Sequence, residues 1–148
     1  MKSKTKYIFF LFILLFCVSS TFAQKGKSKT KPKTKSGYDF QGPYYEGLAR
    51  VKTKLKWGFI DSTGNVVVPL KYNEVTNFDG GVAKVRVGTK WGLIDNKGTV
   101  LRKPTFDAIG EFVNGVAKVL LEGEEYYMNK EGMRCDKNGK HVVNGDVE

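Results

Sequence analysis

The sequence predicts an all-β protein, a tandem array of antiparallel β-hairpin or meander repeats with a period of 34 residues. The motif Gly-x-Ala-x-Val supports this fold class, because it begins at Gly47, returns at Gly81 and returns again at Gly115. Apolar and polar residues also alternate with the two-residue period of strands. Turn sequences that end in glycine separate these stretches. No stretch has the sustained apolar stripe of an amphipathic helix.

Two segments precede the repeats and are set apart from the fold. Residues 1–23 combine three lysines, an apolar run over residues 7–18 and small residues up to Ala23, which is the pattern of a cleaved secretory signal peptide. The run is shorter than the roughly 20 residues that a membrane-spanning helix needs. Residues 24–37 alternate lysine with Gly, Ser, Thr and Pro, which predicts a disordered lysine-rich linker. The protein is therefore expected to be exported.

The positive charge of the chain lies mainly in these leading segments. The chain has 25 Lys and Arg against 15 Asp and Glu, a net charge of +10. Nine of the basic residues precede residue 36, so residues 36–148 are close to neutral. Export and the lack of arginine forks with interleaved aromatics argue against a nucleic-acid partner. The tail from Lys25 to Lys35 is either a solvated spacer or a weak, salt-sensitive contact for an anionic surface.

The β domain is expected to cover residues 38–148, in units of about 44–77, 78–111 and 112–148. Each unit is predicted to contain three short strands and a loop anchored by an aromatic residue. In the first strand of a unit, small apolar residues such as Ala49 and Val51 face one side and cations such as Arg50 the other. This pattern is typical of a strand with one buried face and one solvent-facing side.

The two tryptophans lie in nearly identical segments, KWGFID at 56–61 and KWGLID at 90–95. One unit cannot bury its own apolar face, so neighbouring units are expected to share a core built from the repeated residues. The glycine after each tryptophan leaves room for a neighbouring backbone. If the indole of Trp57 is core, its replacement by alanine should cost about 3–5 kcal/mol. The aromatics expected in this shared core are Trp57, Trp91, Tyr44, Phe78, Phe112, Tyr72 and Phe106.

Two repeated turns are predicted from Asp61 to Gly64 and from Asp95 to Gly98. The Asp side chain can accept backbone amide bonds at the start of the turn, and glycine takes the positive φ at its end. Calcium is the alternative reading of such aspartates, but calcium takes six to eight oxygens and each turn offers a single carboxylate. Turn formation is therefore expected, without a metal site.

With KWGFID and KWGLID in phase with the Gly-x-Ala motif, the chain resembles the WG (KWG) repeat family over roughly residues 40–132. The resemblance implies about three antiparallel β units. Proteins of this family are mostly bacterial, and no enzymatic activity is established for the group. The third unit departs from the pattern, because Glu125 and Tyr126 occupy the Trp-Gly positions. A charge in place of tryptophan suits a solvent-facing unit, so this unit is predicted to be a degenerate C-terminal cap.

A catalytic site is not expected. After cleavage of the signal peptide, Cys135 is the single cysteine and His141 the single histidine, and both lie in a polar C-terminal stretch. A hydrolase with a Cys-His pair is therefore the least favoured function. One cysteine and one histidine cannot supply the four ligands of a structural zinc site, and no cofactor is expected.

The first functional hypothesis is a non-enzymatic interaction module that binds a protein or glycan of a bacterial envelope, in the periplasm or outside the cell. Tyr45, which is out of phase with the repeat, and Tyr126 and Tyr127 are the binding candidates, because amphipathic aromatics can stack on sugars or peptides. The alternative is a structural spacer that is tethered electrostatically through its lysine-rich tail. The partner, the oligomeric state and the choice between an open meander, a solenoid and a closed array stay open.

Overall fold

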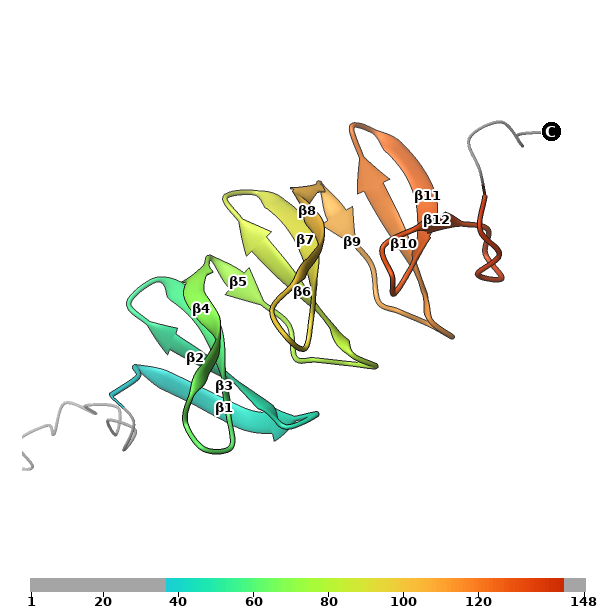
Figure 1. The fold of residues 1–148 in the computed structure, drawn as a ribbon. Coiled ribbons are helices and arrows are strands. Elements are labelled where there is room, and N and C mark those ends of the chain that lie inside the picture. The colour runs from blue at the N-terminus through green and yellow to red at the C-terminus, as the bar shows by residue number, and fades with distance from the viewer. Residues whose placement is uncertain (1–36, 143–148) are drawn as a thin grey trace, which may run out of the picture. The chain divides into compact units, whose positions relative to one another are not determined.

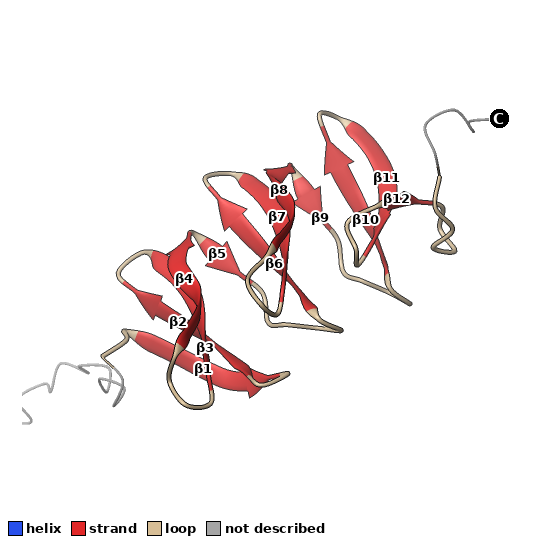
Figure 2. Cartoon of the chain, viewed as in Figure 1, coloured by secondary structure: helices blue, strands red, loops and turns tan. Residues whose placement is uncertain are grey.

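The computed structural model of the protein describes residues 37–142, which form strands and loops (Figure 1, Figure 2). Within this part of the chain no helix has the length and apolar character needed to cross a membrane. The strands make three four-stranded antiparallel sheets in tandem, so the predicted all-β repeat fold is confirmed. The predicted signal peptide, the linker up to residue 36 and residues 143–148 lie outside the described residues.

Each sheet is a meander in which strands that follow one another in sequence pair side by side. The first sheet has the order β1-β2-β3-β4, with β1 (Phe40–Tyr45), β2 (Leu48–Thr53), β3 (Lys56–Asp61) and β4 (Val66–Tyr72). The second has the order β5-β6-β7-β8, with β5 (Glu74–Val75), β6 (Val82–Val87), β7 (Lys90–Asp95) and β8 (Val100–Phe106). The third has the order β12-β11-β10-β9, with β9 (Ala108–Ile109), β10 (Val116–Leu121), β11 (Glu124–Asn129) and β12 (Arg134–Cys135).

A fourth strand in each sheet was not predicted from the sequence. The segment expected to be an aromatic loop begins with a short strand, and in the second sheet Glu74 pairs with Arg86 and Val75 with Val85. In the second and third sheets this strand has only two residues, too few to produce a visible alternation, whereas β1 of the first sheet has six. The sheets consequently begin at Phe40, Glu74 and Ala108, ahead of the predicted unit starts at 44, 78 and 112, although the 34-residue step is unchanged.

An Asp or Asn side chain anchors the central hairpin of every sheet. The turn between the two middle strands starts with a residue at positive φ, whose amide is bound by a side chain 15 residues earlier. The donors are Lys54, Gly88 and Glu122, and the acceptors are Asp39, Asn73 and Asp107, in that order. This bond supports a register that repeats at Leu48↔Asp61 and Val82↔Asp95.

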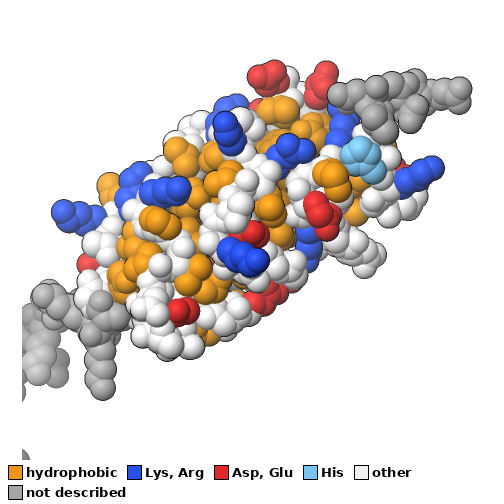
Figure 3. Space-filling view, viewed as in Figure 1, with side chains coloured by type: hydrophobic (Ala, Val, Ile, Leu, Met, Phe, Trp, Pro, Cys, Tyr) orange, Lys and Arg blue, Asp and Glu red, His pale blue; other side chains and the backbone are white. Residues whose placement is uncertain are grey.

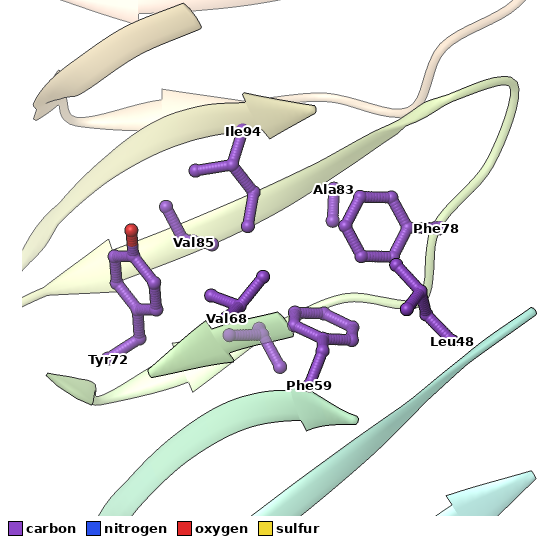
Figure 4. Close-up of a cluster of buried hydrophobic side chains, with 9 residues drawn as sticks. Leu48, Phe59, Val68, Tyr72, Phe78, Ala83, Val85 and Ile94 are labelled. Carbon is purple, nitrogen blue, oxygen red and sulfur yellow. The ribbon is translucent and has the colours of Figure 1, made fainter. Parts of the chain in front are cut away.

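Two apolar clusters lie between consecutive sheets. The first cluster joins Leu48, Phe59 and Val68 of the first sheet to Ala83, Val85 and Ile94 of the second (Figure 4). The second joins Val82, Leu93 and Phe106 to Ala117, Val119 and Met128 of the third sheet. The second sheet therefore buries apolar side chains on both faces, which is how a unit without a core of its own becomes stable in an array.

The stacking corrects the prediction that the cationic side of the strands faces solvent. In β6, Lys84 lies on that side and is only 8% exposed. The prediction was wrong for this strand because the next sheet covers it, which alternation within one strand cannot reveal. The ammonium group of Lys84 is bound instead by the Gly110 carbonyl oxygen, at 3.2 Å, and by Glu111.

The aromatics predicted as core divide into three groups. Tyr72, Phe78 and Phe106 are buried. Trp57 and Trp91 are half-buried at the margins of the two clusters, and Phe112 likewise packs on the second cluster.

Tyr44 corrects the core prediction, because 44% of its surface is exposed. Its repeat equivalents Phe78 and Phe112 pack against the clusters shared with a preceding sheet. In the described part of the chain, no sheet precedes the one that contains Tyr44, so the same sequence position has nothing to fold against.

Replacement of Tyr72 by phenylalanine is expected to leave the free energy of unfolding unchanged or to raise it by up to about 1 kcal/mol. The Tyr72 hydroxyl is buried without a hydrogen-bond partner, and the equivalent residue one period later is Phe106. The reverse change, Phe106→Tyr, should be destabilising, because it buries a hydroxyl where none is accommodated. Urea unfolding of both variants measures the pair, and a clear loss of stability in Tyr72→Phe would contradict the prediction.

The third sheet lacks the apolar outer surface that a further unit would need. Phe59 and Leu93 are followed in phase by Tyr127, which is 38% exposed, and Phe106 is followed by Lys140. Its outermost strand, β12, has two residues before the chain turns back at 136–139. The third unit thus has the polar outer face that suits the end of an array.

Candidate functional site

A pocket of about 440 Å³ is lined in part by the segment between β5 and β6. Its wall comes from β2 of the first sheet, from the second sheet, and from the loop that follows β9 in the third. The pocket therefore exists only where units are stacked. The polar side chains on its wall that decide its chemistry are Arg50, Asn77, Lys84 and Glu111.

Lys84 and Glu111 form a closed ion pair on this wall. The Lys84 Nζ lies 2.5 Å from Glu111 Oε1, and the lysine side chain is 10% exposed. Both partners of this hydrogen bond are charged, and the carboxylate compensates the ammonium group for the loss of water that burial causes. The Lys84 ammonium group is thus already paired and is not available to bind a ligand.

Arg50 is in a different position, although it is the residue that precedes Lys84 by one period. Its Nη1 donates to the Val75 carbonyl oxygen at 3.3 Å, and its guanidinium carbon lies 5.8 Å from the centre of the Trp57 ring. Its Nε is buried and has no hydrogen-bond partner. The side-chain oxygen of Asn77, also on the pocket wall, is likewise buried without a partner.

The remaining charges near the pocket are paired with each other. Arg86 donates to Glu74 through Nε at 3.0 Å and Nη2 at 2.5 Å. Lys130 reaches Asp79, donating to its carbonyl oxygen at 3.0 Å. Figure 3 shows basic and acidic side chains scattered among apolar ones on one face of the molecule. On this face the basic side chains therefore form no extended basic surface.

The Trp-Gly pairs lie at the margin of each shared core. Trp57 pairs with Tyr72 of β4, and Lys52 lies over the indole at 5.2 Å. A Cβ added to Gly58 would lie 2.4 Å from the Val68 carbonyl oxygen, so only glycine allows β4 to close against β3. Gly92 has the same constraint, at 2.6 Å from the Arg102 carbonyl oxygen.

Comparison with known proteins identifies this repeat. The profile of the WG containing repeat matches residues 57–91 and 91–124. Residues 57–124 therefore consist of WG repeats. Two consecutive matches and three sheets agree with about three WG repeats, as the sequence predicts. No curated protein and no solved structure matches the chain.

The three tyrosines considered as binding candidates are not brought together by the WG repeats. Tyr45 is 43% exposed at the end of β1, whereas Tyr126 and Tyr127 lie on β11 of the third sheet. Tyr126 is half-buried, with its ring 6.4 Å from Phe106 and under the Arg134 guanidinium at 4.5 Å. Tyr45 and Tyr127 are the tyrosines of this set with substantial exposed surface.

Tyr126 replaces the glycine of the Trp-Gly pair in the third repeat. It stands at the glycine position, where a side chain in the first two repeats would collide with β4 or β8. In the third repeat, β12 pairs with β11 only through Cys135 and Arg134. The loss of glycine and the shortening of the strand therefore belong together.

Cys135 and His141 face each other across an isolated antiparallel bridge. The thiol is buried, and burial raises the pKa of Cys135, with smaller contributions from Asp136 and Glu131. A raised pKa disfavours the thiolate, which is the nucleophilic form. Among residues 37–142, no group of three His, Cys, Asp or Glu side chains could hold a metal ion.

The turn aspartates bind backbone amides. Asp61 Oδ1 accepts from the amides of Thr63 and Asn65 at 2.9 Å each, and Gly64 has a φ of +91°. Asp95 accepts in the same way from Lys97 and Thr99, and Gly98 has a φ of +85°. These carboxylates are committed to the turns of the WG repeats.

Acid is expected to destabilise the protein partly through these turns. The Thr63 hydroxyl holds the pKa of Asp61 below its ordinary 3.8, and partial burial is outweighed by the amide donors. A carboxyl group with a lowered folded-state pKa stabilises the fold above its unfolded-state pKa, and this stabilisation is lost as the pH falls through the folded-state pKa. The melting temperature should therefore fall as the pH is lowered below about 4.

The variant Asp61→Asn tests the contribution of this turn. Asparagine should preserve the turn, because Asn129 stands at the equivalent position and accepts the Met133 amide at 2.8 Å. Its melting temperature should depend less on pH than that of the parent in the acid range, because the titrating group is gone. Parallel curves for the two proteins would contradict the assignment.

The pocket residues were missed by the search for catalytic and aromatic motifs. A signal was present, since Arg50, Lys84 and Lys118 are separated by 34 residues, as are Asn77 and Glu111. The alternation pattern assigned the cations to a solvent face, and the loop residues were outside every predicted strand. Only the stacking of repeats brings the two sets together.

Proposed function

We propose that this WG-repeat protein is an exported, non-enzymatic interaction module that binds a protein or glycan component of a bacterial envelope. The observation that carries the proposal is the pocket between stacked repeats, with an arginine whose charge has no carboxylate partner among the described residues. A concave site with a few convergent polar groups is the usual form of a binding site. Exposed Tyr45 and Tyr127 offer further amphipathic contacts.

The rival proposal is a spacer domain that is attached only through its lysine-rich tail. The alternating lysines of residues 25–35 favour this possibility, because each can contribute about 1 kcal/mol at an anionic surface. Such attachment is lost at high salt, because exposed charges are then screened.

Capture from the producing cell separates the two proposals. The full chain with a C-terminal tag is expressed in its own cell, and captured envelope components are compared with those of a variant that lacks residues 25–35. The interaction module should capture the same component with and without the tail, and in about 1 M salt. Capture that disappears with the tail or with salt would support the spacer, and failure of the folded chain to capture any component would contradict the interaction module.

A further inference from the structure

Arg50 lacks the carboxylate that both of its repeat equivalents have. Lys84 lies 2.5 Å from Glu111, and Lys118 lies 2.5 Å from Glu125. The pKa of Lys118 is raised, first by its hydrogen bond to Glu125, as expected for an ammonium group beside a carboxylate. The Arg50 guanidinium donates a hydrogen bond to the Val75 carbonyl oxygen, which carries no formal charge.

The missing carboxylate has a specific cause in the sequence. Glu111, the partner of Lys84, is replaced one period earlier by Asn77, so the position that should neutralise Arg50 holds an amide. The Arg50 Nε and the Asn77 Oδ1 are both buried without a hydrogen-bond partner. Burial of an unpaired donor and an unpaired acceptor is unfavourable, so such a pair is a favourable place for a ligand that satisfies both.

The other carboxylates on the pocket wall are committed elsewhere. Glu74 binds Arg86 at 2.5 Å, Asp79 lies 3.4 Å from Lys130, and Glu111 binds Lys84. An external carboxylate could therefore neutralise Arg50 between the first and second sheets. Glu111 neutralises Lys84 in this way between the second and third sheets. Arginine is well suited to this, because its planar fork can hold both oxygens of a carboxylate.

We infer that this pocket binds an acidic peptide segment, with an Asp or Glu side chain on Arg50 and a peptide N–H on the Asn77 oxygen. The chain supplies its own template, because Glu111 is a glutamate that reaches a cation from a loop. A peptide presents a carboxylate acceptor and an amide donor within one residue, and these are the two kinds of partner that Arg50 Nε and Asn77 Oδ1 lack. The inference rests on the proposed function and names the class of partner.

Titration with blocked tripeptides tests the inference. The full chain as the cell processes it carries Trp91→Phe, so that Trp57, 5.8 Å from the Arg50 guanidinium, reports alone. Acetyl-Ala-Glu-Ala-amide should change the Trp57 emission in a saturable way. The peptide with Gln in place of Glu should bind at least about tenfold more weakly, because it lacks the charge that pairs with arginine.

Three variants locate the effect. Arg50→Gln should weaken the Glu peptide about tenfold or more. Asn77→Glu should also weaken binding about tenfold or more, because it places a carboxylate of the chain at the position that Glu111 occupies one period later. Since this carboxylate can pair with Arg50, the variant should fold and should melt no lower than the parent. Lys52→Gln is the control, because Lys52 lies over the same indole but does not line the pocket, and binding should be retained.

Several results would overturn the inference. Equal binding of the Glu and Gln peptides would show that the pocket does not recognise a carboxylate. Unchanged binding by Asn77→Glu would show the same. Binding of glucuronate in place of either peptide would assign the pocket to an acidic glycan. Lack of binding by every probe would reject the acidic-peptide partner, while envelope capture would still decide the proposed function by itself.

Discussion

Replacement of Phe59 by alanine is expected to lower the free energy of unfolding by about 3–5 kcal/mol. The side chain is 0% exposed and lies between the first and second sheets (Figure 4). Its ring centre is 4.6 Å from that of Phe78, so the change removes contacts with both units. Phe59 belongs to the core that the first two sheets share, so the loss should appear in the cooperative urea unfolding of the array.

Two other substitutions give this prediction its scale. Leu55→Ala should change stability by less than about 0.5 kcal/mol, because Leu55 is 76% exposed. Trp57→Ala should cost less than Phe59→Ala, although the sequence alone suggested about 3–5 kcal/mol for a core indole. Trp57 is half-buried and is covered in part by Phe40 at 5.4 Å. If Trp57→Ala proved more damaging than Phe59→Ala, the indole would be the main contact between the sheets.

Features set by short-range chemistry were predictable from the sequence. The Asp61 to Gly64 turn follows from a side-chain acceptor at its start and a glycine at its end, and both are read within four residues. The fold class follows from the period, because residues that recur at 34-residue steps must make equivalent contacts in each unit.

Features set by the neighbouring unit were not predictable from one unit. Lys84 is buried because a third sheet covers it, whereas Tyr44 is exposed because no described sheet precedes its own. Alternation within a strand identifies two faces but does not say how many are covered. The end units of an array therefore differ from the middle unit even where the sequence repeats.

The candidate pocket depends on the same difference between units. Arg50 and Lys84 are equivalent in sequence, yet only Lys84 has an acidic partner, because position 77 holds Asn and position 111 holds Glu. The sequence contains this contrast, but nothing in one unit connects a strand cation with a loop residue 27 positions later. A repeat can thus keep its architecture while a single loop residue, Asn77, leaves the charge of Arg50 without a carboxylate partner among the described residues.

The second large effect is expected for Gly58→Ala, which should lower the free energy of unfolding by about 3 kcal/mol or more. The new Cβ would lie 2.4 Å from the Val68 carbonyl oxygen and 2.9 Å from the Leu70 nitrogen. Both are backbone atoms of β4, so they cannot move aside as a flexible side chain would. A shift of β4 would also displace Val68, which lies in the core shared with the second sheet.

Gly42→Ala is the matched control, because Gly42 is also a strand glycine of the first sheet without a positive φ. Its added Cβ would meet the Phe40 ring at 3.4 Å, which is ordinary contact, so the change in stability should stay within about 1 kcal/mol. The third unit supports the reasoning, because Tyr126 occupies the glycine position where the outer strand is short. Equal stabilities of Gly58→Ala and Gly42→Ala would mean that β4 does not close against β3, and the Trp-Gly pair would then need another explanation than the fit of its fourth strand.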